Sequence, residues 1–180
     1  MQSKDIPNID KSWTLFIDRD GVINERNLEG YITSPEKFNF LPGVFKGLKR
    51  IHDSVGRVII VTNQQGVGKG LMKECNLKDL HGYMVDKLEE SGIHIDEIYA
   101  ATNLRGARND RRKPRPNMAL EARRKFKDID FKKSIMIGDT DGDIRFGMNL
   151  GMKTVLVRSE ESIEGRPDFI VNDLEELAND

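Results

Sequence analysis

Two aspartates one residue apart, Asp18 and Asp20, follow a strand-length apolar run and are themselves followed directly by Gly21. The run, residues 13–17, is apolar on both faces, which is typical of a strand buried in a parallel sheet. The glycine predicts a turn, so the carboxylates should lie at the carboxyl end of the strand, where open α/β sheets bind ligands. Carboxylates held there can bind a hard cation, act as a nucleophile or divide acid and base roles. An isolated Asp-x-Asp-Gly is more often a plain turn, so the other segments must decide.

Two further apolar segments also end in polar side chains. The segment 57–63 ends around Thr62, and the segment 133–139 ends in Asp139. Because the carboxyl ends of parallel strands meet at one edge of a sheet, a central first strand would bring these two side chains next to Asp18. That convergence favours chemistry over a turn.

Strand-like runs alternate with segments of helical spacing along the whole chain, which predicts a doubly wound α/β fold with helices on both faces of a mostly parallel sheet. Asn117 is the candidate N-cap of one helix, and Gly151 is expected to end another. The expected strands are 13–18, 57–63, 95–101, 133–139, 153–158 and 168–171, and the expected helices are 44–51, 77–88, 117–126, 141–150 and 173–178.

Composition sets the class of protein. The 180 residues, 37% hydrophobic and 33% charged with a net charge of −1, predict one globular domain over residues 1–180. Near-neutral charge provides no general attraction for nucleic acid or an anionic membrane. Cys75 is the only cysteine, which fits a reducing compartment, and no apolar stretch approaches the ~20 residues of a spanning helix. With a polar segment 1–10 unlike a signal peptide, we expect a cytoplasmic monomer without nucleic-acid or membrane partners.

Four short motifs follow one another at these strand ends and in one loop. Together they resemble the haloacid dehalogenase superfamily of phosphotransferases, over roughly residues 15–157. Arg19, the pair Asn63-Gln64 and Arg112 resemble more narrowly the branch of heptose-bisphosphate and histidinol-phosphate phosphatases. The motifs are Asp18-Arg19-Asp20-Gly21, Val61-Thr62-Asn63-Gln64, Arg112-Lys113-Pro114 and Gly138-Asp139-Thr140-Asp141-Gly142-Asp143.

Phosphoryl transfer needs a nucleophile in line with the leaving group, neutralisation of charge, and a proton for the departing alkoxide. Asp18 is the candidate nucleophile, forming an aspartyl-phosphate. Asp20 is the candidate general acid, which would later accept a proton from the hydrolytic water. That role asks for a carboxyl group that exchanges protons near neutral pH.

A metal site is expected beside the nucleophile. Asp139 is the third candidate ligand, and the resemblance implies that Asp18 and the backbone carbonyl of Asp20 complete a Mg²⁺ site, for which oxygen donors are suited. Asp143 lies about one helical turn beyond Asp139 and could orient the ligands from behind. The alternative is that Asp141 and Asp143 are first-turn acids that complement the helix dipole; we favour this for Asp141 and the orienting role for Asp143.

Five residues are candidates for holding phosphate: Thr62, Asn63, Gln64, Arg112 and Lys113. The threonine hydroxyl and the Asn63 backbone N–H would bind the transferred group, and the lysine would neutralise it together with the nucleophile. The planar guanidinium of Arg112 suits a second, non-reacting phosphate. The other arginines of the loop 105–115 are left unassigned, and the loop lacks the aromatic residues that stack on nucleic-acid bases.

The chain departs from the branch in the stretch 102–111. Many members carry a zinc loop of cysteines and a histidine there, whereas this stretch has neither, so no zinc is expected and other contacts must hold the loop. The segment 24–39 is too short for a large cap domain, which predicts an open site. Glu25, Arg26 and Tyr31 are further candidate substrate contacts. The remaining histidines, His52, His81 and His94, show no ligand spacing and are interpreted as structural or surface residues.

We therefore expect a Mg²⁺-dependent phosphatase for a small phosphorylated metabolite. The resemblance implies D-glycero-D-manno-heptose 1,7-bisphosphate losing its 7-phosphate, with histidinol phosphate as the nearest alternative and a polynucleotide 3′-phosphate as a more remote one. A phospho-accepting receiver domain is a different class, but it accepts phosphate after the third strand, which here ends in Tyr99-Ala100-Ala101. A pure sugar-phosphate-binding module would not need both Asp18 and Asp20.

Overall fold

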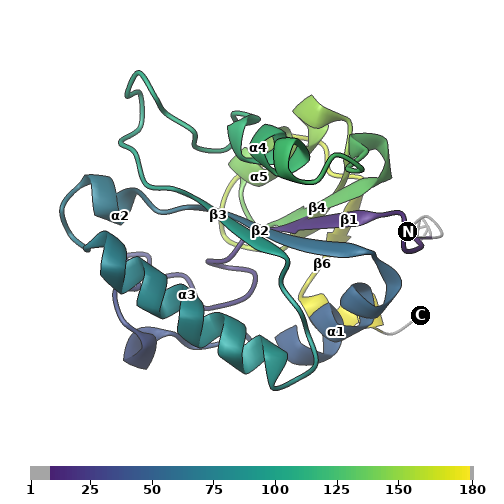
Figure 1. Ribbon diagram of the computed structural model, residues 1–180, viewed down its shortest axis with the longest axis horizontal. Helices are drawn as coiled ribbons and strands as arrows, with labels where there is room; N and C mark the ends of the chain where they lie inside the picture. The colour runs from purple at the N-terminus through teal and green to yellow at the C-terminus, as the bar shows by residue number, and fades with distance from the viewer. Residues whose placement is uncertain (1–8, 179–180) are drawn as a thin grey trace.

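The computed structural model describes residues 9–178, so most of the polar segment 1–10 lies outside the described residues. A six-stranded parallel sheet forms the middle of the molecule, in the order β3-β2-β1-β4-β5-β6 (Figure 1). The strands are β1 (Thr14–Ile17), β2 (Arg57–Asn63), β3 (Glu97–Ala101), β4 (Ser134–Gly138), β5 (Lys153–Val157) and β6 (Phe169–Val171).

Strand β1 lies between β2 and β4, and all four of its residues are buried. Ile17 is in register with Ile60 of β2 and with Ile137 of β4, so the three strands advance together toward their carboxyl ends. This confirms the prediction of a central first strand. Both faces of the strand are buried, which explains why Leu15, Phe16 and Ile17 are all apolar and do not alternate with polar residues.

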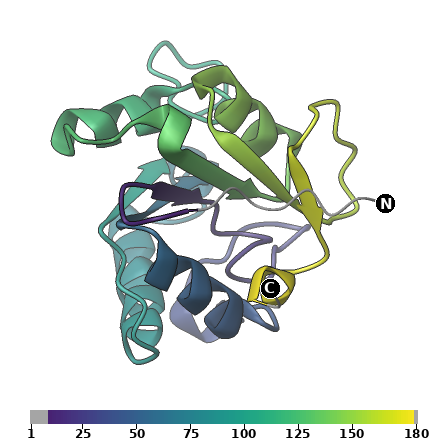
Figure 2. The same cartoon turned by 90° about the vertical axis from the view of Figure 1, so that its right-hand side faces the viewer.

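Helices cover both faces of the sheet, as predicted (Figures 1 and 2). One face carries α1 (Val44–Ser54), α3 (Glu74–Glu89) and the 3-10 helix η3 (Leu174–Ala178), and the other carries α4 (Asn117–Lys125) and α5 (Asp141–Leu150). The short elements η1 (Pro35–Lys37), α2 (Gln65–Gly68) and η2 (Phe131–Lys133) lie in the connections, and the described residues contain no large cap domain.

Alternating side chains of the central strand divide the core into two layers. Ile17 packs with Leu48 of α1 and Leu80 of α3, whereas Phe16 packs on the opposite side with Met118 of α4 and Phe146 of α5. Two-sided coverage explains the near-continuous apolar strands. Among residues 9–178, no helix combines the length and the apolar character needed to cross a bilayer.

Helix ends match the sequence pattern at α5 and differ at α4. Gly151 ends α5 with a positive φ of 73°, as predicted. Asn117, however, is the first residue of α4 and not its cap; Pro116 takes the N-cap position with no side-chain cap hydrogen bond. The prediction was wrong because the carbonyl of Pro116 already accepts the first helical hydrogen bond, from the Leu120 N–H. The expected terminal helix is present as the 3-10 helix η3.

Helix α1 contacts η3 at Gly47, where a Cβ atom would lie 2.0 Å from the carbonyl oxygen of Leu174. We predict that Gly47→Ala lowers the free energy of unfolding by about 1–3 kcal/mol, because backbone must shift to admit the methyl group. Gly82 in α3 is the matched control: its Cβ would meet nothing within 4 Å. Gly82→Ala should raise stability by about 0.5–1 kcal/mol through helix propensity. Urea unfolding measures both; equal effects of the two variants would contradict the close packing.

Candidate active site

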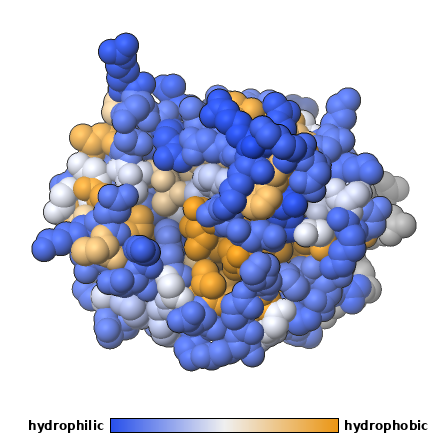
Figure 3. All heavy atoms as spheres, viewed as in Figure 1, coloured by the Kyte–Doolittle hydropathy of each residue, from blue (hydrophilic) through white to orange (hydrophobic). Residues whose placement is uncertain are grey.

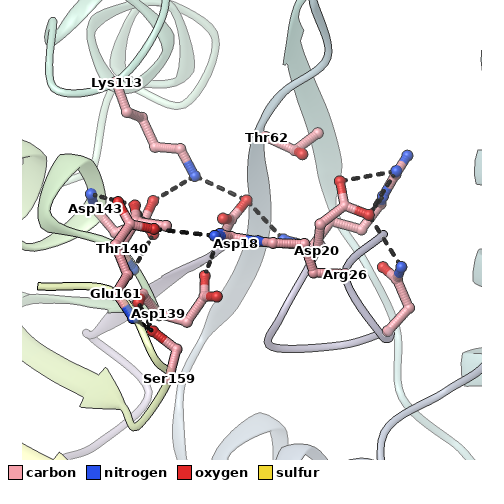
Figure 4. A network of polar contacts seen from close by, with 12 residues as sticks. Asp18, Asp20, Arg26, Thr62, Lys113, Asp139, Thr140, Asp143, Ser159 and Glu161 are labelled. Carbon is pink, nitrogen blue, oxygen red and sulfur yellow. Dashed lines mark hydrogen bonds and ion pairs between the residues drawn. The ribbon is translucent and has the colours of Figure 1, made fainter. Parts of the chain in front are cut away.

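The carboxyl ends of β1, β2 and β4 converge on one polar cavity of about 660 Å³ (Figure 4). The structure thus brings together side chains predicted from all four motifs. Gln64 does not line this cavity. Asp139 lines a neighbouring cavity, and the Arg26–Glu161 ion pair borders both cavities. The predicted site residues that line the cavity are Asp18, Asp20, Thr62, Asn63, Arg112, Lys113 and Asp143.

Asp18 is 6% exposed, and its two polar contacts fall on the same oxygen. Its Oδ1 accepts a hydrogen bond of 2.7 Å from the Arg19 backbone N–H and an ion pair of 2.8 Å from Lys113 Nζ. Among the described residues no hydrogen bond or ion pair involves Oδ2, which leaves this oxygen available for attack or for a cation. Burial and the charge of Asp143 raise the pKa of Asp18 to about 6, so the group is largely ionised at neutral pH.

Lys113 links the nucleophile candidate to Asp143. Its Nζ lies 2.8 Å from Asp18 Oδ1 and 2.6 Å from Asp143 Oδ1 (Figure 4). The ammonium also donates to the carbonyl oxygen of Val61 at 2.6 Å. Burial opposes the charge, but the two carboxylates outweigh it and raise the pKa of Lys113, so the ammonium stays protonated. The Asn63 side chain fixes this lysine by accepting from its backbone N–H at 2.9 Å.

Asp143 caps helix α5 and pairs with Lys113. Its Oδ2 accepts from the backbone N–H and the hydroxyl of Thr140, while its own N–H donates to Thr140 Oγ1, which forms a capping box at the start of α5. Its other oxygen pairs with Lys113. Gly138 permits this packing, because a Cβ there would lie 2.1 Å from the Cβ of Asp143. Asp141 instead accepts from the backbone N–H groups of Glu164 and Gly165 and so holds the 159–165 loop.

Three buried carboxylates form a cluster that could hold a metal ion. Asp18, Asp139 and Asp143 each offer one oxygen, and these oxygens all lie within 4.8 Å of one another. Burial and the charge of Asp18 raise the pKa of Asp139 to about 8, although Arg26 opposes this at 2.9 Å. A divalent cation would relieve this mutual repulsion, and an all-oxygen donor set fits Mg²⁺. The Asp20 carboxylate lies outside the cluster.

Asp20 has a different environment. Its carboxylate accepts from Gln64 Nε2 at 2.6 Å, from Asn24 Nδ2 at 2.9 Å and from Arg19 Nη2 at 2.8 and 2.9 Å. Burial alone would raise the pKa of Asp20, but the Arg19 charge and these hydrogen bonds outweigh it and hold the pKa below its usual range. The protein alone therefore keeps Asp20 ionised, whereas an acid role asks for a proton near neutral pH.

Gln64 was predicted to bind phosphate, and the structure gives it two protein partners. Its side chain is almost fully buried, and Nε2 donates to Asp20 and, at 2.8 Å, to Thr62 Oγ1. It therefore connects the ends of β1 and β2. Thr62 still lines the cavity.

Some arginines of the basic loop 105–115 line the cavity and others do not. Arg105, Arg112 and Arg115 line the cavity. Arg108 is exposed outside it, and Arg111 pairs with Glu121. Burial and the nearby Arg105 lower the pKa of Arg112, as expected of a half-buried cation beside a like charge.

Asp110 holds this loop and was missed from the sequence. Its Oδ2 accepts from the Gly106 N–H and its Oδ1 from the Arg112 N–H, both at 3.0 Å, and Arg115 Nε lies 3.7 Å away. An aspartate that accepts from the backbone two residues ahead is a recognisable local signal. These contacts hold a stretch that has no cysteine or histidine.

The candidate substrate contacts in the 24–39 loop have three different placements. Arg26 bridges Asp139 at 2.9 Å and Glu161 at 3.0 Å. Tyr31 lines the cavity, with its ring so close to Gly66 that a Cβ there would come within 2.8 Å. Glu25 is exposed and outside the cavity lining. Glu161 had no local sequence signal, because it lies far along the chain from its partner.

Comparisons with known proteins agree with this geometry. Residues 110–177 match a family model described as HAD-hydrolase-like. The D-glycero-alpha-D-manno-heptose-1,7-bisphosphate 7-phosphatase of Campylobacter jejuni is 36% identical over 171 residues, 94% of this chain and 95% of that protein. The protein of the same name from Mycobacterium bovis is 36% identical over 77% of this chain and 73% of its own. A D,D-heptose 1,7-bisphosphate phosphatase from B. bronchiseptica, crystallised with magnesium and phosphate, has a TM-score of 0.80 at 25% identity, over 92% of this chain and 96% of that one.

The raised pKa of Asp139 predicts how stability depends on pH without metal. A carboxyl whose folded-state pKa is about 8 contributes stability that is complete below its unfolded value and is lost as pH rises through 8. With a chelator present, we expect the free energy of unfolding to fall by about 1 kcal/mol per pH unit between roughly pH 6.5 and 8. Below that range His81, a partly buried imidazole that burial and Arg19 keep neutral, acts in the opposite direction. Asp139→Asn should flatten the slope in urea unfolding; an unchanged slope would contradict the assignment.

Proposed function

Because the chain belongs to the haloacid dehalogenase superfamily of phosphatases, we propose that it removes the 7-phosphate from D-glycero-D-manno-heptose 1,7-bisphosphate with the help of Mg²⁺. The chain is a phosphoric monoester hydrolase of this superfamily. The observation that carries the substrate proposal is the charge pattern of the cavity. Buried carboxylates lie at the strand ends, Lys113 of the basic loop pairs with Asp18, and three arginines of the same loop, Arg105, Arg112 and Arg115, also line the cavity. One cavity can thus hold a reacting phosphate and a second phosphate.

The reaction begins with the free oxygen of Asp18. Oδ2 attacks phosphorus, the bond from phosphorus to the sugar oxygen breaks, and an aspartyl-phosphate forms. Lys113, fixed by Asn63 and Asp143, balances the negative charge that gathers on the nucleophile and the phosphoryl oxygens. Mg²⁺ held by Asp18 and Asp139, and by the Asp20 carbonyl as the family resemblance implies, would neutralise further phosphoryl charge.

Asp20 gives its proton to the departing sugar oxygen and recovers one from the water that hydrolyses the aspartyl-phosphate. In the protein alone this carboxyl is held ionised, chiefly by Arg19. A phosphate dianion bound at Asp18 places negative charge close to Asp20, and like charge raises the pKa of a carboxyl group. Substrate binding would therefore supply the shift that the protein alone does not.

Arg112 is our candidate for the second phosphate. It lines the cavity half-buried, with a guanidinium that no ion pair of the described residues engages, and Asp110 fixes its backbone. A planar guanidinium binds phosphate oxygens in pairs. Histidinol phosphate has no second phosphate, so this feature favours the bisphosphate.

A phospho-accepting receiver domain is the rival of a different class, and β3 ends in Tyr99-Ala100-Ala101 without an acid. We also propose a cytoplasmic monomer. Cys75 is free and exposed, as suits a reducing compartment.

The mechanism predicts that Asp18→Asn lowers kcat by on the order of 10³-fold or more with the fold intact, because the nucleophile is lost. Asp20→Asn should lower kcat by about 10²–10⁴-fold on a sugar phosphate, because proton transfer is lost. Steady-state kinetics with Mg²⁺ measure both, circular dichroism checks the fold, and removal of Mg²⁺ with EDTA should abolish wild-type turnover until the ion is restored. Near-wild-type activity of either variant would refute its assignment.

The second-phosphate proposal predicts a change in KM that depends on the substrate. Arg112→Met should raise KM for the 1,7-bisphosphate by about 10-fold or more, because a charge-assisted contact is lost. KM for a sugar 7-monophosphate should change little. Arg108→Met, at the exposed arginine outside the cavity, is the matched control and should alter neither. Equal KM changes on both substrates would refute the second-phosphate role.

A further inference from the structure

Arg19, the residue between Asp18 and Asp20 in the sequence, is a fully buried cation. Its Nε and Nη2 donate to the Asp20 carboxylate, and its guanidinium lies 5.9 Å from the centre of the Phe38 ring. A buried charge is stable only where its hydrogen-bonding groups have partners. Asp20 satisfies one side of the guanidinium, so the other side needs an acceptor from elsewhere.

That acceptor is His81 of α3. Arg19 Nη1 lies 3.1 Å from His81 Nε2, and in the part of the chain that the structure describes this is the one hydrogen-bond partner of Nη1. A guanidinium can only donate, so Nε2 must accept and the ring proton must be on Nδ1. Burial and the charge of Arg19 lower the pKa of His81 to about 3, which agrees with a neutral ring. His81 therefore has a defined tautomer and a defined partner.

We propose that His81 is a positioning residue for the general acid: it fixes the Arg19 guanidinium, which in turn fixes the Asp20 carboxylate. This inference rests on the acid role of Asp20 in the proposed function. The order of these contacts follows from the fold, because His81 is held by a helix of the core and Arg19 lies between His81 and Asp20. α3 packs against the sheet through Leu80, Met84 and Leu88, and this packing positions the imidazole against Arg19.

The other side of the imidazole is accessible. His81 lines a groove of about 730 Å³ between α3 and the edge strand β3, together with Leu77, Val85, Ile95 and Ile98. Figure 3 shows apolar side chains gathered on this face, over the region between β3 and α3 in the view of Figure 1. Substitution of His81 therefore acts on Arg19 from outside the catalytic cavity and changes the identity of no cavity-lining residue.

The test separates proton delivery from general damage by varying the leaving group. With a general acid, kcat/KM depends only weakly on the pKa of the leaving alcohol, because the leaving oxygen is protonated as it departs and need not carry a negative charge. We would measure kcat/KM with Mg²⁺ for p-nitrophenyl phosphate, phenyl phosphate and a sugar phosphate. The variants are His81→Leu, which removes the acceptor, and His81→Gln, which keeps an acceptor at similar reach. His94→Gln, at the exposed histidine after α3, is the control.

We expect His81→Leu to lower kcat/KM by about 10-fold or more for the sugar phosphate and by less than about 3-fold for p-nitrophenyl phosphate, a part of the 10²–10⁴-fold that general acid catalysis supplies. His81→Gln and His94→Gln should behave as wild type. A parallel loss for all esters after His81→Leu, or no loss, would overturn the inference. If His81→Leu does not fold, His81→Asn, which is polar but too short to reach Arg19, takes its place with the same criteria.

Asp20→Asn, measured with the same esters, separates a failure of the positioning role of His81 from a failure of the acid role of Asp20. If Asp20→Asn steepens the dependence on the leaving group and the His81 variant does not, the positioning role fails and the proposed function stands. If Asp20→Asn leaves the dependence unchanged, the acid role itself fails and the inference fails with it. With both roles correct, His81→Leu should add no further steepening in the Asp20→Asn background.

Discussion

The site depends on one unfavourable interaction, the repulsion among three buried carboxylates at the ends of β1 and β4. Asp18, Asp139 and Asp143 present oxygens within 4.8 Å of one another in a setting with little water. Burial of like charges at such distances is costly unless cations or protons compensate. Lys113 compensates from one side and Arg26 from the other, yet burial first and the neighbouring carboxylates second still raise the pKa values of Asp18 and Asp139. The remaining repulsion is what a divalent cation would relieve.

The two aspartates of the first motif are separated electrostatically although only one residue lies between them. Asp18 faces the carboxylate cluster, and its pKa is raised, whereas Asp20 faces Arg19, Asn24 and Gln64, and its pKa is lowered. In the protein alone these shifts are the reverse of what an acid and a nucleophile need, so the proposed roles require bound phosphate to raise the pKa of Asp20. Gly21, with its positive φ of 87°, lets Asp139 pack against the turn, because a Cβ at this position would lie 2.0 Å from Asp139 Oδ2.

Much of this arrangement could be predicted from the sequence because strand ends are local features. The apolar runs located β1, β2 and β4, and the rule that ligands bind at the carboxyl ends of parallel strands joined Asp18, Thr62 and Asp139. Partners from distant segments could not be predicted: the Arg26–Glu161 pair spans 135 residues, and His81 meets Arg19 across 62. The sequence also did not indicate where the Gln64 side chain points: it donates to Asp20 and Thr62 and does not line the cavity. Asn117 shows that a good capping residue does not cap when a proline already begins the helix.

The central claim is that Asp18 carries the phosphoryl group during turnover. It can be tested by acid-quenching the enzyme during steady turnover of a sugar phosphate, reducing the acyl-phosphate with borohydride and locating the product by peptide mass spectrometry. We expect reduction of a single carboxyl group, that of Asp18, and none when substrate is omitted. Reduction at another carboxyl group, or turnover with no reducible group at Asp18 under conditions that trap acyl-phosphates, would contradict the account.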